Sequence, residues 1–190
     1  MIAGLVLAAG DGSRFGADSK LLADLRGRPL LEYAVDAQCA VPELERVVVV
    51  LGAHAEQIRA RVRFGRAEPV ICEDWARGQS ASLRHGVGEL RGAERVIVTL
   101  GDQPLITPAV IARFIGAADG ARAVYRGVPG HPVVLGSAQM AAVEGLEGDR
   151  GARELLRGGE LIECAELSSG SDVDTWEDLE AVRDEARSIV

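Results

Sequence analysis

Short apolar runs alternate, over the first 120 residues, with stretches whose apolar positions recur at helical spacing. The runs are rich in Val and Ile and do not alternate apolar with polar residues, which is typical of parallel strands buried on both faces. They occupy Ile2–Ala8, Arg46–Leu51, Glu68–Cys72 and Arg95–Leu100. The helical patterns occupy Pro29–Ala40, Ala55–Val62, Ser80–Leu90 and a segment from Thr107-Pro108 to about Ala117. This order predicts an α/β fold, a doubly wound and mostly parallel sheet with helices on both faces.

The pattern after residue 120 is less regular. Strands are expected at Ala121–Arg126, Pro132–Leu135 and Leu161–Leu167, with a turn at Val128-Pro129-Gly130. A last helix is expected to start near Thr175, whose hydroxyl can cap it, and Asp178 has the spacing of a capping box. Because no repeat or long linker interrupts the chain, we expect a single domain over residues 1–190.

Composition excludes several classes of function. Apolar residues make up 47% and charged residues 26%, and the net charge of −8 disfavours binding to nucleic acid or to an anionic membrane. No apolar run reaches the roughly 18 residues of a membrane helix, and the first run lacks the basic region of a signal peptide. The cysteines, Cys39, Cys72 and Cys164, are widely spaced, form no metal or redox motif and indicate a reducing compartment. We therefore expect a cytoplasmic protein.

A glycine-rich loop follows the first strand and runs from Gly10 through Gly12 and Gly16 to Lys20. Glycines let the backbone turn tightly and point N–H groups at an anion, and Arg14 and Lys20 add positive charge, so the loop predicts a polyphosphate site. Lys20 is the single lysine among 21 basic residues, and the chain has no Asn. A lysine retained in such a chain is a candidate for a specific role.

Two common phosphate-binding patterns do not fit this loop. The Walker pattern fails because Ala17 follows Gly16, and the dinucleotide pattern G-x-G-x-x-G fails at Phe15. The second strand is followed by Gly52-Ala53-His54, without the acidic residue that an NAD site uses. An NAD(P)-dependent oxidoreductase is thereby disfavoured and stays open as an alternative.

The glycine-rich loop has the pattern Ala8-Ala9-Gly10-x-Gly12-x-Arg14-x-Gly16, followed by Lys20. It resembles the signature loop of the nucleotidyltransferases with a glycosyltransferase-A-type fold. Within them it looks closest to the molybdenum cofactor cytidylyltransferases and guanylyltransferases. The resemblance implies a Rossmann-like nucleotide-binding half over residues 1–120 and an acceptor-side half over 121–190. It also implies that Arg14 and Lys20 contact phosphates as catalytic residues and that Ala8, Ala9, Gly10 and Gly12 bind the substrate.

Carboxylates follow the fourth strand and precede the last helix. Asp102, after Gly101 at a strand end, is placed to approach a phosphate-bound Mg²⁺, although a turn aspartate before proline is also common. Asp102-Gln103-Pro104 resembles the family's Asp-x-Pro metal motif, which implies that Asp102 is the principal, catalytic Mg²⁺ ligand and that Gly101 borders the substrate. The segment from Asp172 to Leu179 resembles a second family motif and suggests Asp174 as the other ligand, with Asp172 as the fallback. Helix capping alone is the competing interpretation for these acids.

Three further segments resemble parts of the family that select substrates. Gly78-Gln79-Ser80-Ala81-Ser82-Leu83 is similar to a segment of the cytidylyltransferase branch, which implies that Gly78, Ser80 and Ser82 bind substrate. Ala9 stands where the guanylyltransferase branch has glycine, which favours CTP over GTP. Gly130-His131-Pro132 and Gly148-Asp149-Arg150-Gly151-Ala152-Arg153 resemble acceptor-side motifs. They imply that His131, Asp149 and Arg153 line the second-substrate pocket, although a lone histidine is as often structural.

The resemblance implies Mg²⁺-dependent transfer of a nucleoside monophosphate, with CMP from CTP favoured, to the terminal phosphate of molybdopterin or the molybdenum cofactor. Pyrophosphate is released, and a molybdoenzyme or its chaperone is a possible downstream partner. Three alternatives stay open: a sugar-1-phosphate nucleotidyltransferase on the same fold, the NAD(P)-dependent oxidoreductase, and a non-catalytic protein that hands cofactor to a molybdoenzyme.

Overall fold

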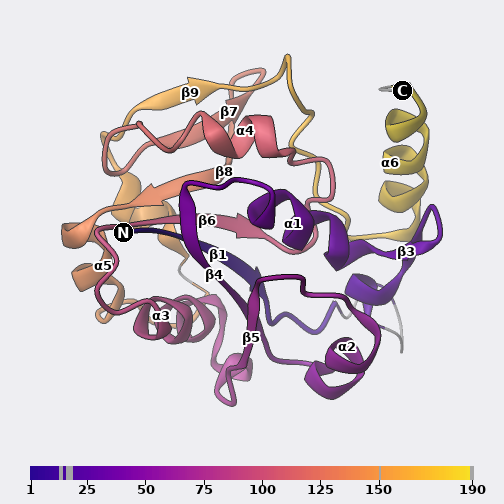
Figure 1. Cartoon of the computed structure of the whole chain (residues 1–190), viewed down its shortest axis with the longest axis horizontal. Helices are drawn as coiled ribbons and strands as arrows, with labels where there is room; N and C mark the ends of the chain where they lie inside the picture. The colour runs from indigo at the N-terminus through magenta and orange to yellow at the C-terminus, as the bar shows by residue number, and fades with distance from the viewer. Residues whose placement is uncertain (13–14, 16–18, 150, 189–190) are drawn as a thin grey trace.

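A seven-stranded sheet runs through both halves of the chain in the computed structural model, which describes residues 1–12, 15, 19–149 and 151–188 (Figure 1). The strand order is β5-β4-β1-β6-β8-β7-β9. The strands are β1 (Ile2–Ala8), β4 (Leu44–Leu51), β5 (Glu68–Ile71), β6 (Arg95–Leu100), β7 (Arg122–Tyr125), β8 (Val128–Leu135) and β9 (Leu161–Glu163). A small separate hairpin consists of β2 (Asp24–Leu25) and β3 (Arg28–Pro29).

Strands β5, β4, β1 and β6 are parallel, whereas β8 pairs antiparallel with both β6 and β7. The predicted α/β fold with a mostly parallel sheet is thereby confirmed. The chain leaves β1 toward β4 on one side and reaches β6 on the other, so the strand order reverses between β1 and β6. In open α/β sheets, ligands bind outside the carboxyl ends of strands at such a reversal.

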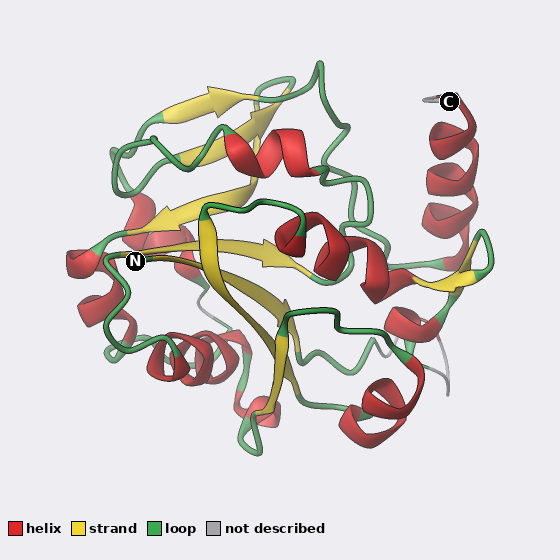
Figure 2. Cartoon of the chain, in the orientation of Figure 1, coloured by secondary structure: helices red, strands yellow, loops and turns green. Residues whose placement is uncertain are grey.

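Helices cover both faces of the sheet, as Figure 2 shows. They are α1 (Leu30–Cys39), α2 (Ala55–Arg61), α3 (Gln79–Glu89), α4 (Pro108–Ala112), α5 (Ser137–Val143) and α6 (Trp176–Ser188). One core cluster packs α1, α2 and α4 against the sheet, and a second packs α3, α5 and the 3-10 turn Ala152–Leu156 against the other face. The apolar strands fill both clusters, which explains why they show no polar alternation.

Helix α6 stands at the edge of the molecule beside the β2–β3 hairpin (Figure 1). A third apolar cluster holds it there, joining Leu179 and Val182 to Leu25 and Phe15. The Phe15 and Trp176 rings lie 4.3 Å apart between centroids. The last helix therefore packs against part of the glycine-rich loop.

The predicted capping box of the last helix is present. The backbone N–H of Asp178 donates to the Thr175 hydroxyl at 3.2 Å, and the backbone N–H of Thr175 donates to the Asp178 carboxylate at 2.8 Å. The Thr175 hydroxyl also donates to the Asp178 carboxylate at 2.9 Å, and this bond is the largest cause of a lowered pKa for Asp178.

Three sequence expectations were wrong in their boundaries. Helix α4 ends at Ala112 instead of near Ala117, because the amides that follow bond three residues back and tighten the chain around the buried Phe114. The hairpin turn lies at Arg126 and Gly127, both with positive φ, whereas Val128-Pro129-Gly130 begins β8. Proline is tolerated there because β6 pairs only with the later residues of β8. Strand β9 stops at Glu163, whose side chain accepts the backbone N–H of Cys164 and Ala165 and forms a turn.

No helix within the described ranges is both long enough and apolar enough to span a membrane.

A buried carboxylate ties the first helix to the segment that follows α2. Glu32 is 2% exposed and accepts hydrogen bonds from Arg63 at 2.9 Å and Arg28 at 3.0 Å. The Arg63 side chain is the largest cause of a pKa for Glu32 lowered from 4.5 to about 2. Because the folded state favours the charged form, this contribution to stability is present above pH 4.5 and is lost as the pH falls toward 2.

Replacing Glu32 by Gln is expected to lower the free energy of unfolding by about 1–3 kcal/mol at pH 7, because the guanidinium groups lose their buried counter-charge. Urea denaturation should show that the difference from wild type shrinks between pH 4.5 and pH 2. Glu56→Gln, at a side chain 84% exposed, serves as the control and should change stability by less than about 0.5 kcal/mol. A Glu32→Gln deficit of the same size at pH 2 and pH 7 would contradict the linkage.

Candidate active site

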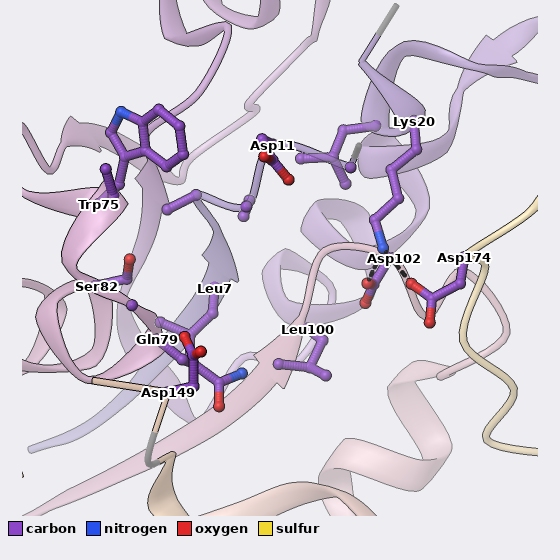
Figure 3. Close-up of a pocket in the computed structure, with 17 residues that line it drawn as sticks. Leu7, Asp11, Lys20, Trp75, Gln79, Ser82, Leu100, Asp102, Asp149 and Asp174 are labelled. Atoms are coloured by element: carbon purple, nitrogen blue, oxygen red, sulfur yellow. Dashed lines mark hydrogen bonds and ion pairs between the residues drawn. The ribbon is translucent and has the colours of Figure 1, made fainter. Parts of the chain in front are cut away.

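A pocket of about 650 Å³ opens at the carboxyl ends of β1 and β6, where the strand order reverses. Its walls come from the glycine-rich loop, the start of α3, the turn after β6 and the loops before α6. The lining residues are Leu7, Ala8, Ala9, Gly10, Asp11, Gly12, Lys20, Leu21, Trp75, Ala76, Gly78, Gln79, Ser82, Leu100, Asp102, Asp149 and Asp174. Figure 3 shows two ends, with Lys20, Asp102 and Asp174 at one and Trp75, Gln79, Ser82 and Asp149 at the other.

A three-charge cluster lies at the first end. The Lys20 ammonium donates to Asp102 Oδ2 at 2.7 Å and to Asp174 Oδ1 at 2.8 Å (Figure 3). The Lys20 side chain is only 12% exposed. Its burial opposes the charged form, but the charges and hydrogen bonds of the two carboxylates outweigh burial and raise the pKa of Lys20 above 10.5. The ammonium is therefore charged across the physiological range.

Two glycines bring this cluster together. Gly12 has a φ of +60° and lies so close to the Lys20 stem that a Cβ there would sit 3.0 Å from Cγ. At Gly101 a Cβ would lie 3.0 Å from the Ala8 Cβ and 2.8 Å from Leu31. The absent side chain thus lets the turn that carries Asp102 pack against the end of β1.

The acidic segments that approach Lys20 are bound to each other through the backbone. The N–H of Val173 donates to the carbonyl oxygen of Asp102 at 2.9 Å. This bond joins the turn after β6 to the chain just before α6. As a result Asp102 and Asp174 face the first pocket, whereas their neighbours Gln103 and Asp172 line a second one.

The second pocket has a volume of about 450 Å³ and shares Leu100 with the first. Two arginines, Arg122 and Arg153, line it together with His131. Burial lowers the pKa of His131 to about 4, with the Arg153 charge adding to the effect, so the imidazole is neutral at pH 7. The β7–β8 hairpin, the 3-10 turn Ala152–Leu156 and residues 169–172 form its walls.

Asp172, in the second pocket, accepts a hydrogen bond from the Gln103 amide at 2.6 Å. Burial raises the pKa of Asp172, and the nearby charge of Asp102 raises it further. The structure thus places Asp174, and not the fallback Asp172, against Lys20.

The far end of the first pocket depends on the loop before α3. Gly78 has a φ of +104°, and a Cβ there would lie 2.5 Å from the Gly148 backbone and 2.8 Å from Asp149 Oδ1. Gly52 has a similar role for Trp75, because a Cβ at Gly52 would lie 2.5 Å from the Trp75 Cβ. The two glycines make room for Asp149 and Trp75 in the pocket wall.

Most residues predicted for the site line one of these pockets, but the predictions for Ser80, Asp149 and Gly101 need correction. Ser80 is 1% exposed and lines neither pocket, because its place in the first turn of α3 directs it into the protein. Asp149 lines the first pocket instead of the second-substrate side, because the loop at 148–149 packs against Gly78. Gly101 is absent from the lining and acts through close packing. Arg14 lies outside the described residues.

Sequence reasoning missed several lining residues. Trp75 is one of only two tryptophans and begins the 3-10 turn between β5 and α3, and its rarity is a usable signal. Gln103 occupies the variable position of the Asp-x-Pro motif, between Asp102 and Pro104. Arg122 is one arginine among 20 and carries no local signal, so only the sheet order reveals that it faces a pocket.

The three-charge cluster of Lys20, Asp102 and Asp174 offers carboxylate oxygens that a divalent cation could bind. Asp102 Oδ1 is buried and has no hydrogen-bond partner among the residues that the structure describes. No group of three or more His, Cys, Asp or Glu side chains gathers for a metal in the described part of the chain. Two carboxylates, completed by phosphate oxygens and water, are a set that Mg²⁺ accepts. Asp102 and Asp174 therefore fit a metal that binds together with a phosphate ligand.

Comparisons with known proteins give one family model and several related chains. Residues 4–166 match the model of the MobA-like NTP transferase domain. Nicotine blue oxidoreductase of Paenarthrobacter nicotinovorans is 33% identical, over 94% of each chain. The Rv0371c homologue of Mycobacterium sp. strain JC1 is 29% identical with a TM-score of 0.87, covering 100% of this chain and 98% of that one. Rv0371C of Mycobacterium tuberculosis in complex with manganese is 26% identical with a TM-score of 0.78, covering 96% and 98%.

Gly78→Ala is expected to lower the free energy of unfolding by about 1–3 kcal/mol, because it combines an unfavourable φ with a backbone clash. Urea denaturation measures the change. Gly88→Ala, inside α3, is the control, since a Cβ there meets nothing within 4 Å, and it should be neutral or stabilising by up to about 1 kcal/mol. Equal stability of the two variants would show that Gly78 does not need to be glycine.

Proposed function

Since the chain belongs to the MobA-like NTP transferase family, whose members are nucleotidyltransferases, we propose that it transfers CMP from CTP to the terminal phosphate of molybdopterin in a Mg²⁺-dependent reaction. The family membership confirms the resemblance read from the sequence. The nucleotide, the metal and the acceptor are the parts proposed here.

The observation that carries the proposal is the position of the charge cluster between two pockets. Lys20, Asp102 and Asp174 lie in the first pocket, and Gln103 and Asp172 directly beside them line the second. A donor nucleotide in the first pocket and an acceptor in the second would place their reacting phosphates at this junction. Holding two reactants in such a geometry supplies much of the catalysis of a group transfer.

In the proposed reaction an oxygen of the acceptor phosphate attacks the α-phosphorus of the nucleotide. A new P–O bond forms, the bond to the bridging oxygen breaks, and pyrophosphate leaves with that oxygen. The acceptor oxygen is already anionic, so no side chain needs to remove a proton. Lys20 donates hydrogen bonds to phosphate oxygens, and Arg14 is proposed to do the same. Asp102 and Asp174 would hold Mg²⁺, which when bound neutralises charge on the phosphates.

The charges of the first pocket support a metal. Its described lining contains four carboxylates, Asp11, Asp102, Asp149 and Asp174, and one cationic side chain, Lys20. A triphosphate would be repelled from such a lining unless cations accompanied it. The related Rv0371C was solved in complex with manganese, which supports a divalent metal as part of the proposal.

The choice of CTP rests on the wall near Ala9. This residue is 4% exposed, lines the pocket and has its carbonyl oxygen bound by the backbone N–H of Ala53 at 3.0 Å. Its methyl group therefore occupies a fixed position where the guanylyltransferase branch has only a hydrogen. Trp75 at the same end offers an aromatic face for a base.

The chemistry of the second pocket is compatible with a phosphorylated pterin. Arg122 and Arg153 can attract an anionic acceptor, and neutral His131 can donate and accept hydrogen bonds. Val133 and Leu156 add apolar surface for a flat ring. The choice of a pterin among phosphorylated heterocycles comes from the family resemblance.

The name of the related nicotine blue oxidoreductase favours a second candidate, NAD(P)-dependent redox chemistry. The structure offers little for such a cofactor. Among the described residues, a three-residue 3-10 turn, Lys20–Leu22, follows the glycine-rich loop, and the first α-helix begins only at Leu30. No α-helix N-terminus in the described residues is therefore placed directly after the loop to bind a pyrophosphate. Gly52, Ala53 and His54 follow β4, where a carboxylate would bind the ribose. The other alternative is a non-catalytic protein that hands cofactor to a molybdoenzyme. Such a protein would bind the same ligands without releasing pyrophosphate.

Asp102→Asn is expected to reduce pyrophosphate release from CTP, Mg²⁺ and molybdopterin by about 100-fold to 1,000-fold, because it removes a charge needed to hold the metal. The fold should survive, since the side chain keeps its shape. Asp119→Asn, which removes a carboxylate paired with Arg95 at 2.9 Å, is the control and should retain the wild-type rate. Wild-type turnover by Asp102→Asn would refute the metal assignment.

Nucleotide selectivity is testable by thermal unfolding with CTP, GTP, ATP, UTP or NADPH, each with Mg²⁺. A ligand at 100 times its Kd stabilises the folded state by about 2.7 kcal/mol, which for a chain of this size raises the Tm by roughly 5–10 °C. CTP is expected to give the largest rise. Stabilisation by NADPH alone would favour the oxidoreductase, and a larger rise with GTP would reverse the base assignment.

A further inference from the structure

The Lys20 ammonium occupies the position between two carboxylates where a bound cation would lie. Its Nζ is 2.7 Å from Asp102 Oδ2 and 2.8 Å from Asp174 Oδ1, and only 12% of the side chain is exposed. Mg²⁺ binds carboxylate oxygens directly, at about 2.0–2.1 Å. The ammonium that contacts both oxygens fills the space that a cation held by Asp102 and Asp174 would need.

The ammonium also relieves a repulsion within the fold. Asp102 is 20% exposed, and Asp174 is directed toward the same point from another segment. Two carboxylates that face each other at such a site disfavour each other's charge unless a cation lies between them. The hydrogen bonds of Lys20 are therefore one reason that both carboxylates hold their positions before any ligand binds.

We propose that Lys20 acts as an internal counter-ion that keeps the metal site closed until a nucleotide arrives. The inference rests on the proposed function, because it assigns the metal to Asp102 and Asp174. A triphosphate would give the ammonium new anionic partners, so Lys20 would move from the carboxylates to the phosphates and leave Asp102 and Asp174 to hold the metal. Metal and nucleotide then raise each other's affinity by the same factor, as linkage requires.

Two further observations support the exchange. The ammonium bonds Oδ2 of Asp102, whereas Oδ1 of the same carboxylate has no hydrogen-bond partner among the described residues. Lysine is also the suitable residue, in a chain whose other basic side chains are all arginine. Its ammonium is a compact charge on a flexible stem, whereas a guanidinium would bind a carboxylate through a rigid two-pronged contact.

Mn²⁺ binding measured by electron paramagnetic resonance, with and without CTP, tests the exchange in the full-length chain. Lys20→Met is expected to bind Mn²⁺ at least about 10-fold more tightly than wild type when no nucleotide is present, because the carboxylates lose their internal cation. The same variant should bind CTP more weakly. The factor by which CTP raises Mn²⁺ affinity should therefore fall by 10-fold or more.

Arg28→Met is the matched control. Arg28 also bridges two carboxylates, Glu32 at 3.0 Å and Asp36 at 2.5 Å, and it lies outside the pocket. The substitution changes the net charge by the same amount and should leave Mn²⁺ affinity at the wild-type value. An equal gain in Arg28→Met and Lys20→Met would reduce the effect to net charge and overturn the proposal.

Lys20→Arg keeps a cation at the site and covers the case in which Lys20→Met fails to fold. It should bind Mn²⁺ alone as weakly as wild type, and tighter binding would overturn the proposal. If wild type binds Mn²⁺ with CTP but Lys20→Met gains no affinity for Mn²⁺ alone, the exchange is wrong and the proposed function stands. If wild type binds no Mn²⁺ even with CTP, the metal-dependent function fails and this inference fails with it.

Discussion

The ammonium of Lys20 joins two carboxylates that lie 82 and 154 residues further along the chain. This contact joins the glycine-rich loop, the turn after β6 and the segment before α6 at one point of the candidate site. Further contacts anchor the turn and the segment before α6 to the rest of the fold. Gly101 packs the turn against β1, a backbone bond ties Val173 to Asp102, and the apolar cluster around Leu179 holds α6 in place.

The contact also explains how an acidic chain can present a site for anions. The net charge is −8, and the described lining of the first pocket is itself dominated by carboxylates. Binding of a polyphosphate there depends on a few concentrated positive charges, of which Lys20 is one and a metal is proposed as another. The second pocket has a different balance, since Arg122 and Arg153 outnumber Asp172. The two pockets thus differ in charge although they meet at adjacent residues.

Fold prediction succeeded where the signal was local and failed where it was not. The buried parallel strands read directly from apolar runs, because a strand covered on both faces needs no polar alternation. The turn at Arg126 and Gly127 was misplaced, because Pro129 and Gly130 are common turn residues and only strand pairing excludes them. Helix α4 was overextended, because its apolar periodicity continues through Phe114 while the backbone has already tightened. The β2–β3 hairpin and α5 are too short to show a period.

The sequence by itself determined the α/β class, the glycine-rich loop and the family, and it identified Lys20, Asp102 and Asp174 as candidates. These conclusions depend on local patterns, which a chain carries without folding. Only the tertiary structure decided that the three side chains meet, that Ser80 is buried, and that Asp149 lies in the first pocket while Arg122 lies in the second. Those relations depend on strand order and on the packing of distant segments, and no residue spacing along the chain encodes them.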